Sequence, residues 1–134
     1  MIKEFKTLYP VKIYIGINIT EEEVESIVDY KKGFIDIPQQ LDICGQTYYF
    51  YHKRTENDTT TDESVCVNIN IDIDTERQLI QTIAHESLHA TNMIYKIIGE
   101  ENTSTTNDEP FAFLLEEIVG FCYDTVNEYK LNNK

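Results

Sequence analysis

Two stretches of the chain alternate apolar residues with other residues, and a period of two predicts β-strands. Every odd position is Val or Ile in residues 11–19 and again in residues 65–73. Successive side chains of a strand point to opposite faces of its sheet. Each of these strands is therefore expected to bury one face.

A third strand is expected at residues 47–52, where Tyr and Phe are concentrated. A turn near Gly45 would pair this strand with residues 41–43 as a hairpin. Residues 34–41 contain Pro38, which is compatible with an extended or edge segment but not with a central strand.

Apolar residues recur every three or four positions in the last part of the chain, and this period predicts two long helices. The first is expected over about residues 75–98 and should end at Gly99. It is apolar around much of its surface, which predicts packing on more than one side. The second should begin near Asp108 or Glu109, because Pro110 suits the first turn of a helix.

A shorter helix should follow the first strand, because Thr20 and Glu23 have the spacing of a capping box and Gly33 is a suitable stop. The 134 residues are expected to form one domain, 1–134. We predict an α+β fold, a short mixed or antiparallel sheet packed on the two long helices.

The first long helix contains the motif His-Glu-Ser-Leu-His at residues 85–89. Residues four apart share one face of a helix, so His85 and His89 can present two imidazole nitrogens to one ion. This ligand type predicts zinc, with Glu86 as the general base acting on a zinc-bound water. The alternative interpretation is two helix-face histidines with a solvated Glu86 between them.

A catalytic zinc ion usually has three protein ligands, so a further ligand is required. We favour Glu109 on the second long helix, because it follows His89 by 20 residues and Ala112 would let the two helices approach closely. Glu116 lies on the same stripe of that helix and is the rival candidate. His52 is expected at the surface, near the end of a strand.

The composition excludes several classes of partner. A formal charge of −13 would repel nucleic acid and anionic membranes. Charged or polar residues interrupt every apolar run before it reaches membrane-spanning length, and the first residues do not form a secretory signal. Three cysteines without a C-x-x-C spacing predict reduced thiols. We therefore expect a cytoplasmic protein that binds neither nucleic acid nor membrane.

The motif at residues 85–89, followed by Glu-Pro-Phe-Ala-Phe-Leu-Leu at residues 109–115, resembles small phage-encoded and bacterial HExxH metallopeptidases. It is also similar to the ImmA/IrrE-type metallopeptidases. The resemblance extends over about residues 75–121. It implies a minimal gluzincin-like zinc peptidase fold in which His85, His89 and Glu109 bind the metal and Glu86 is the catalytic base.

The predicted function is zinc-dependent hydrolysis of peptide or protein substrates. The alternative is a non-catalytic zinc-binding interaction protein, such as a phage accessory protein, whose metal only joins two helices. Residues 65–73 lead directly into the motif helix, so we also hypothesise that they form a sheet edge that pairs with a substrate peptide. The sequence does not indicate an oligomeric state.

Overall fold

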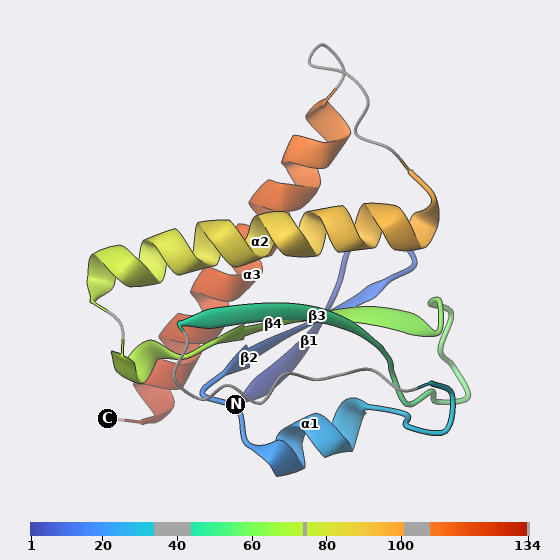
Figure 1. Cartoon of the computed structure of the whole chain (residues 1–134), viewed down its shortest axis with the longest axis horizontal. Coiled ribbons are helices and arrows are strands. Elements are labelled where there is room, and N and C mark those ends of the chain that lie inside the picture. Colours follow the sequence, from blue (N-terminus) through green and yellow to red (C-terminus); the bar gives the residue numbers. More distant parts are fainter. Residues whose placement is uncertain (34–43, 74, 101–107, 134) are drawn as a thin grey trace.

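A computed structural model describes residues 1–33, 44–73, 75–100 and 108–133 of the chain (Figure 1). Its elements are β1 (Ile2–Lys6), β2 (Lys12–Ile17), α1 (Glu21–Ile27), β3 (Gly45–Tyr51), β4 (Glu63–Ile69), a 3₁₀ turn (Ile71–Ile73), α2 (Glu76–Ile98) and α3 (Glu109–Asn132). The α+β class is confirmed. The expected segments 34–41 and 41–43 lie outside the described residues, and with 41–43 so does one arm of the hairpin expected with residues 47–52. Gly45, near which the turn of this hairpin was expected, is instead the first residue of β3.

The four strands form one mixed sheet in the order β1-β2-β4-β3. The central pair, β2 and β4, is parallel, whereas β1 and β3 pair antiparallel with β2 and β4 respectively. β4 is thus paired on both sides. The hypothesis that residues 65–73 form a sheet edge is wrong, because the 3₁₀ turn ends this segment and both neighbours of β4 are occupied.

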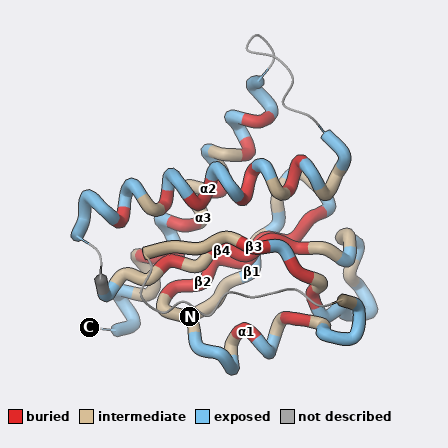
Figure 2. The backbone as a smooth tube through the Cα atoms, viewed as in Figure 1, coloured by how far each residue is buried: buried red, intermediate tan, exposed pale blue. Residues whose placement is uncertain are grey.

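Both faces of the sheet are covered in its centre, as the buried (red) positions of β2 show in Figure 2. α2 and α3 cover one face, and α1 lies below the other (Figure 1). All six residues of β2 are buried, contrary to the expected alternation. Ile13 and Ile15 belong to the core under α2 and α3, while Tyr14 belongs to the core beside α1.

β1 was not predicted, because its apolar residues Ile2 and Phe5 are three positions apart and do not alternate. The strand is placed by distant contacts instead. The Phe5 ring stacks on that of Phe121 in α3 at a centroid distance of 4.4 Å. Strand β1 is therefore specified by tertiary packing and not by its local pattern.

The predicted helix boundaries are mostly confirmed. Thr20 and Glu23 form the expected capping box of α1, although this helix ends at Ile27, well before Gly33. α2 ends at Gly99, whose φ of 75° is the left-handed conformation that glycine adopts without strain. α3 begins at Glu109 with a proline in its first turn.

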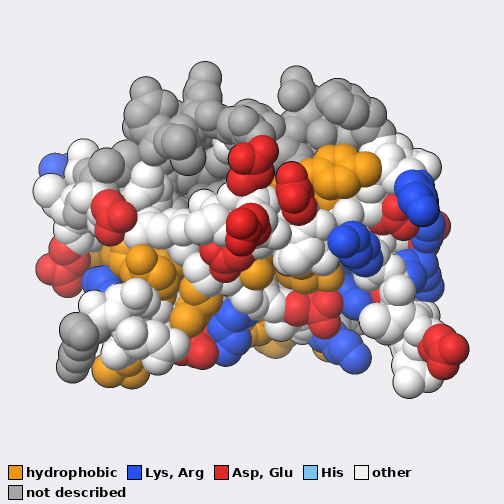
Figure 3. Space-filling model, turned by 90° about the horizontal axis from the view of Figure 1, so that it is seen from below, with side chains coloured by type: hydrophobic (Ala, Val, Ile, Leu, Met, Phe, Trp, Pro, Cys, Tyr) orange, Lys and Arg blue, Asp and Glu red, His pale blue; other side chains and the backbone are white. Residues whose placement is uncertain are grey.

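Figure 3 shows the face of the molecule on which α1 lies, and both acidic and basic side chains are exposed on this face. Among the helices of the described residues, none combines the length and the apolar character needed to cross a membrane.

Candidate metal centre

The two histidines of the motif converge on the exposed side of α2. The Nε2 atoms of His85 and His89 are 3.1 Å apart, and their rings meet at 77° with centroids 4.7 Å apart. Both residues are exposed. Zinc–nitrogen bonds are about 2.0–2.1 Å long, so two nitrogens on one tetrahedral zinc ion lie roughly 3.3 Å apart. The pair therefore fits two ligands of a single zinc ion.

Glu86 differs from the two histidines in being buried, with 7% of its surface exposed. The hydroxyl of Thr47 in β3 donates to Glu86 Oε2 at 2.5 Å. Gly45 permits this approach of β3, because a Cβ atom there would lie 2.9 Å from Glu86 Cγ. The alternative interpretation required a solvated Glu86, and the structure buries this side chain instead.

α3 contacts the side of α2 that faces away from the histidine pair. Ser87 Oγ lies 3.8 Å from Cys122 Sγ of α3. Ser87 is two residues from each histidine, which corresponds to about 200° of rotation around the helix. At this level of α2, the histidines and α3 are therefore on opposite flanks.

The structure does not bring the predicted third ligand to this pair. Glu109 and Glu116 are both exposed on α3. Within the described ranges, no group of three or more His, Cys, Asp or Glu residues is arranged to hold a metal ion. Ala112 is exposed too, so its expected role in close helix packing is wrong. Glu109 as third ligand stays a prediction.

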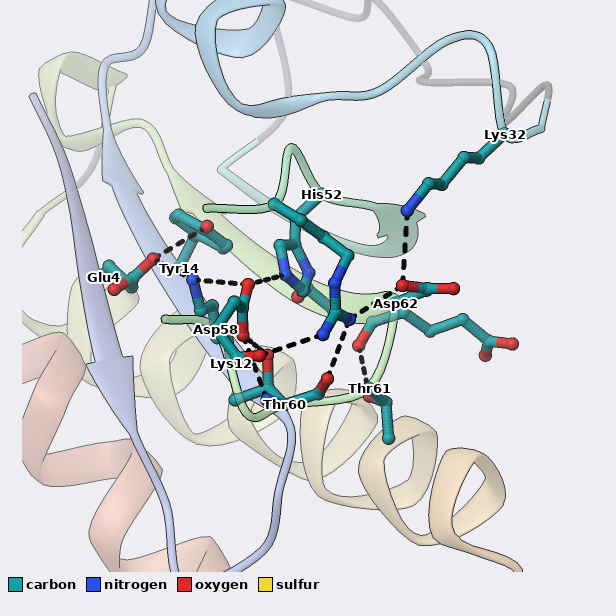
Figure 4. Close-up of polar contacts among 12 residues, drawn as sticks. Glu4, Lys12, Tyr14, Lys32, His52, Asp58, Thr60, Thr61 and Asp62 are labelled. Atoms are coloured by element: carbon teal, nitrogen blue, oxygen red, sulfur yellow. Dashed lines mark hydrogen bonds and ion pairs between the residues drawn. The ribbon is translucent and has the colours of Figure 1, made fainter. Parts of the chain in front are cut away.

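A second polar cluster lies on the α1 side of the sheet (Figure 4). His52 is fully buried, so the prediction of a surface histidine is wrong. Its Nε2 lies 2.7 Å from Asp58 Oδ2, and its Nδ1 lies 2.6 Å from Ser64 Oγ. A carboxylate only accepts hydrogen bonds, so Nε2–H donates to Asp58, and in the neutral ring Nδ1 accepts from Ser64.

Lys12 adds a positive charge to this cluster. Its Nζ lies 3.1 Å from both Asp58 Oδ2 and Glu4 Oε1. Burial alone would raise the pKa of Asp58, but hydrogen bonds from Thr60, His52 and Lys12 outweigh burial and hold this pKa far below its ordinary range. The Asp58 carboxylate is therefore held in its charged form inside the protein.

The residue types Ser64, His52 and Asp58 match those of a hydrolytic triad, but their placement does not. The Ser64 residue and the side chains of His52 and Asp58 have no solvent exposure, so a substrate cannot reach the serine hydroxyl. The hydrogen bonds of the cluster join His52 after the end of β3, Asp58 in the β3–β4 connection and Ser64 at the start of β4. Sequence reasoning missed it because Asp58 lies in a polar segment without periodicity, where a solvated side chain is the usual expectation.

Comparison with known proteins gives no match, whether to a protein-family model, to a curated protein or to a solved structure. The resemblance to ImmA/IrrE-type metallopeptidases thus stays a hypothesis carried by the two motif segments.

The charged state of Asp58 predicts a specific loss of stability in acid. Because its folded pKa lies below the ordinary 3.8, its contribution is present above about pH 4 and is lost as the pH falls below that value. Asp58→Asn should lower the free energy of unfolding at pH 7 by about 3–5 kcal/mol, since Lys12 loses a buried partner. Urea unfolding of both proteins from pH 7 down to about pH 3 measures the difference.

The matched control is Asp124→Asn, which removes an exposed carboxylate from α3 and should change stability little. The difference between wild type and Asp58→Asn should shrink below about pH 4. A difference that stays constant across the acid range would contradict the role assigned to Asp58.

Proposed function

We propose that the chain is a zinc-dependent peptidase with a minimal gluzincin-like active site. In this proposal His85 and His89 bind the metal, and Glu86 is the general base. The observation that carries the proposal is the 3.1 Å approach of the two Nε2 atoms, next in sequence to a buried carboxylate. Two imidazoles at the spacing that one tetrahedral ion requires, with a carboxylate beside them, are the residue types of metal-assisted hydrolysis.

Zinc, when bound, supplies a Lewis acid that polarises the scissile carbonyl and makes a nearby water more acidic. Glu86 then accepts a proton from the attacking water and can deliver it to the leaving amine. Its burial places this proton transfer in a region of low dielectric constant, where charge–dipole interactions are stronger than in water. His85 and His89 lie in consecutive turns of α2, so the helix backbone fixes their positions relative to each other.

Glu109 remains our proposed third ligand, and the resemblance supports it. This assignment requires the first turn of α3 to approach His85 and His89 on metal binding, since all ligands of one zinc ion lie within about 2.3 Å of it. Glu116 as the ligand would likewise require its part of α3 to approach His85 and His89. We further propose a cytoplasmic, phage-type protein that acts on peptide or protein substrates.

The metal assignment predicts one zinc ion per chain and a higher melting temperature when zinc is added. Loss of a residue that only hydrogen-bonds a metal ligand typically weakens metal affinity by roughly 10–100-fold. His89→Ala removes a ligand itself, so it should weaken zinc affinity by more than that. Competition titration with a zinc-sensitive dye, combined with thermal unfolding, measures both effects. Asn92→Ala changes another exposed residue of α2 and is the control. Equal zinc affinity in the wild type and His89→Ala would show that the metal does not use this pair.

The role of Glu86 distinguishes a peptidase from a non-catalytic zinc-binding protein. Glu86→Gln keeps the size of the side chain but removes its basicity, so zinc content should be retained. Hydrolysis of a peptide library or of a denatured protein should fall by about 10²–10⁴-fold, the usual value of general base catalysis. A zinc-loaded Gln variant as active as its parent would exclude Glu86 as the base.

A further inference from the structure

We propose that Thr47 of β3 is a positioning residue for Glu86, an inference that rests on the peptidase function proposed above. The Thr47 hydroxyl lies 2.5 Å from Glu86 Oε2 and 3.2 Å from the Glu86 carbonyl oxygen. A hydroxyl has one hydrogen to donate. The carboxylate is the nearer and the charged acceptor, and hydrogen bonds to charged groups are the stronger ones.

The hydrogen bond from Thr47 makes the two carboxylate oxygens of Glu86 inequivalent, because it reaches Oε2. Thr47 is the one hydrogen-bond donor to this carboxylate within the described part of the chain. One lone pair of Oε2 is therefore engaged, whereas no donor from the described residues reaches Oε1. A buried carboxylate with a single donor is costly unless another polar group completes its bonding. In the proposed reaction Oε1 is the oxygen that takes the proton from the attacking water.

The strand that carries Thr47 is itself held firmly against α2. Gly45, two residues earlier, lies so close to the helix that a Cβ atom there would meet Thr82 Cγ2 at 2.5 Å. Along one edge, β3 also pairs with β4 over its whole length, from Gly45 opposite Ile69 to Tyr51 opposite Glu63. These contacts limit movement of the Thr47 hydroxyl relative to Glu86, which is the condition for positioning a catalytic base.

Thr47→Val tests the proposal, because it keeps the shape of the side chain and removes the hydroxyl. Thr47→Ser is the matched control that keeps the hydroxyl. In the zinc-loaded enzyme we expect Thr47→Val to lower kcat on a peptide substrate by at least about tenfold, with KM and zinc content unchanged. Thr47→Ser should retain most of the wild-type kcat. A merely structural role of Thr47 would not give a selective loss of kcat that serine rescues.

A second measurement uses the metal-free protein and does not depend on activity. Thr47→Val and Glu86→Met, alone and together, are compared by urea unfolding at pH 7 in a double-mutant cycle. We expect the effect of Thr47→Val on the unfolding constant to be at least about fivefold smaller once Glu86 is Met. Equal effects in the two backgrounds would show that the Thr47 hydroxyl does not stabilise the Glu86 carboxylate, which would overturn the proposal.

The outcomes separate this proposal from the function on which it rests. A wild-type protein that hydrolyses peptides while Thr47→Val keeps its full kcat overturns the positioning role and leaves the peptidase intact. A wild type that neither binds zinc nor hydrolyses any peptide overturns both. A loss of kcat in Thr47→Val that Thr47→Ser restores supports both.

Discussion

The packing of α2 on the sheet determines the direction of every side chain in the His-Glu-x-x-His motif. One side of the helix, with Ile83, Ala90 and Ile94, is buried in the core that includes β2 and β4. Helix geometry then places Glu86 at the border of that buried side and leaves His85 and His89 exposed. A rotation of α2 by one residue would expose the carboxylate or bury an imidazole. The chemistry of the motif therefore depends on the apolar contacts that fix the phase of the helix.

The sheet contributes through both of its faces. On the α2 side, Thr47 contacts Glu86 from β3. On the α1 side, His52, Asp58 and Ser64 join the end of β3, the following connection and the start of β4. A buried network of this kind stabilises a fold only when each polar member has its partner. The network lies at the end of β3, the strand whose Thr47 contacts the proposed catalytic base Glu86. Loss of the network would therefore destabilise the strand that holds Thr47 in place.

Features that depend on neighbouring residues could be predicted from the sequence. The capping box at Thr20, the end of α2 at Gly99 and the convergence of His85 and His89 each depend on residues within four positions of one another, or on the conformation of one residue. The α+β class followed from the same local patterns.

Features that depend on tertiary contacts could not be predicted in this way. Whether β4 is central or at an edge depends on its pairing with β2, which is distant in sequence. The burial of His52 requires a charged partner, Asp58, from a segment without periodicity. The placement of Glu109 depends on how α3 crosses α2, and the stripe that carries Glu109 and Ala112 faces solvent, because the neighbouring apolar stripe is the one that packs.

The most direct test of this account is a crystal structure of the zinc-loaded protein with anomalous scattering measured at the zinc edge. We predict one strong anomalous peak at about 2.0–2.1 Å from the Nε2 atoms of both His85 and His89. The electron density around that peak also identifies which carboxylate, Glu109 or Glu116, completes the ligand set. A zinc peak elsewhere on the molecule, or zinc-soaked crystals in which the histidine pair holds no ion, would contradict the central claim.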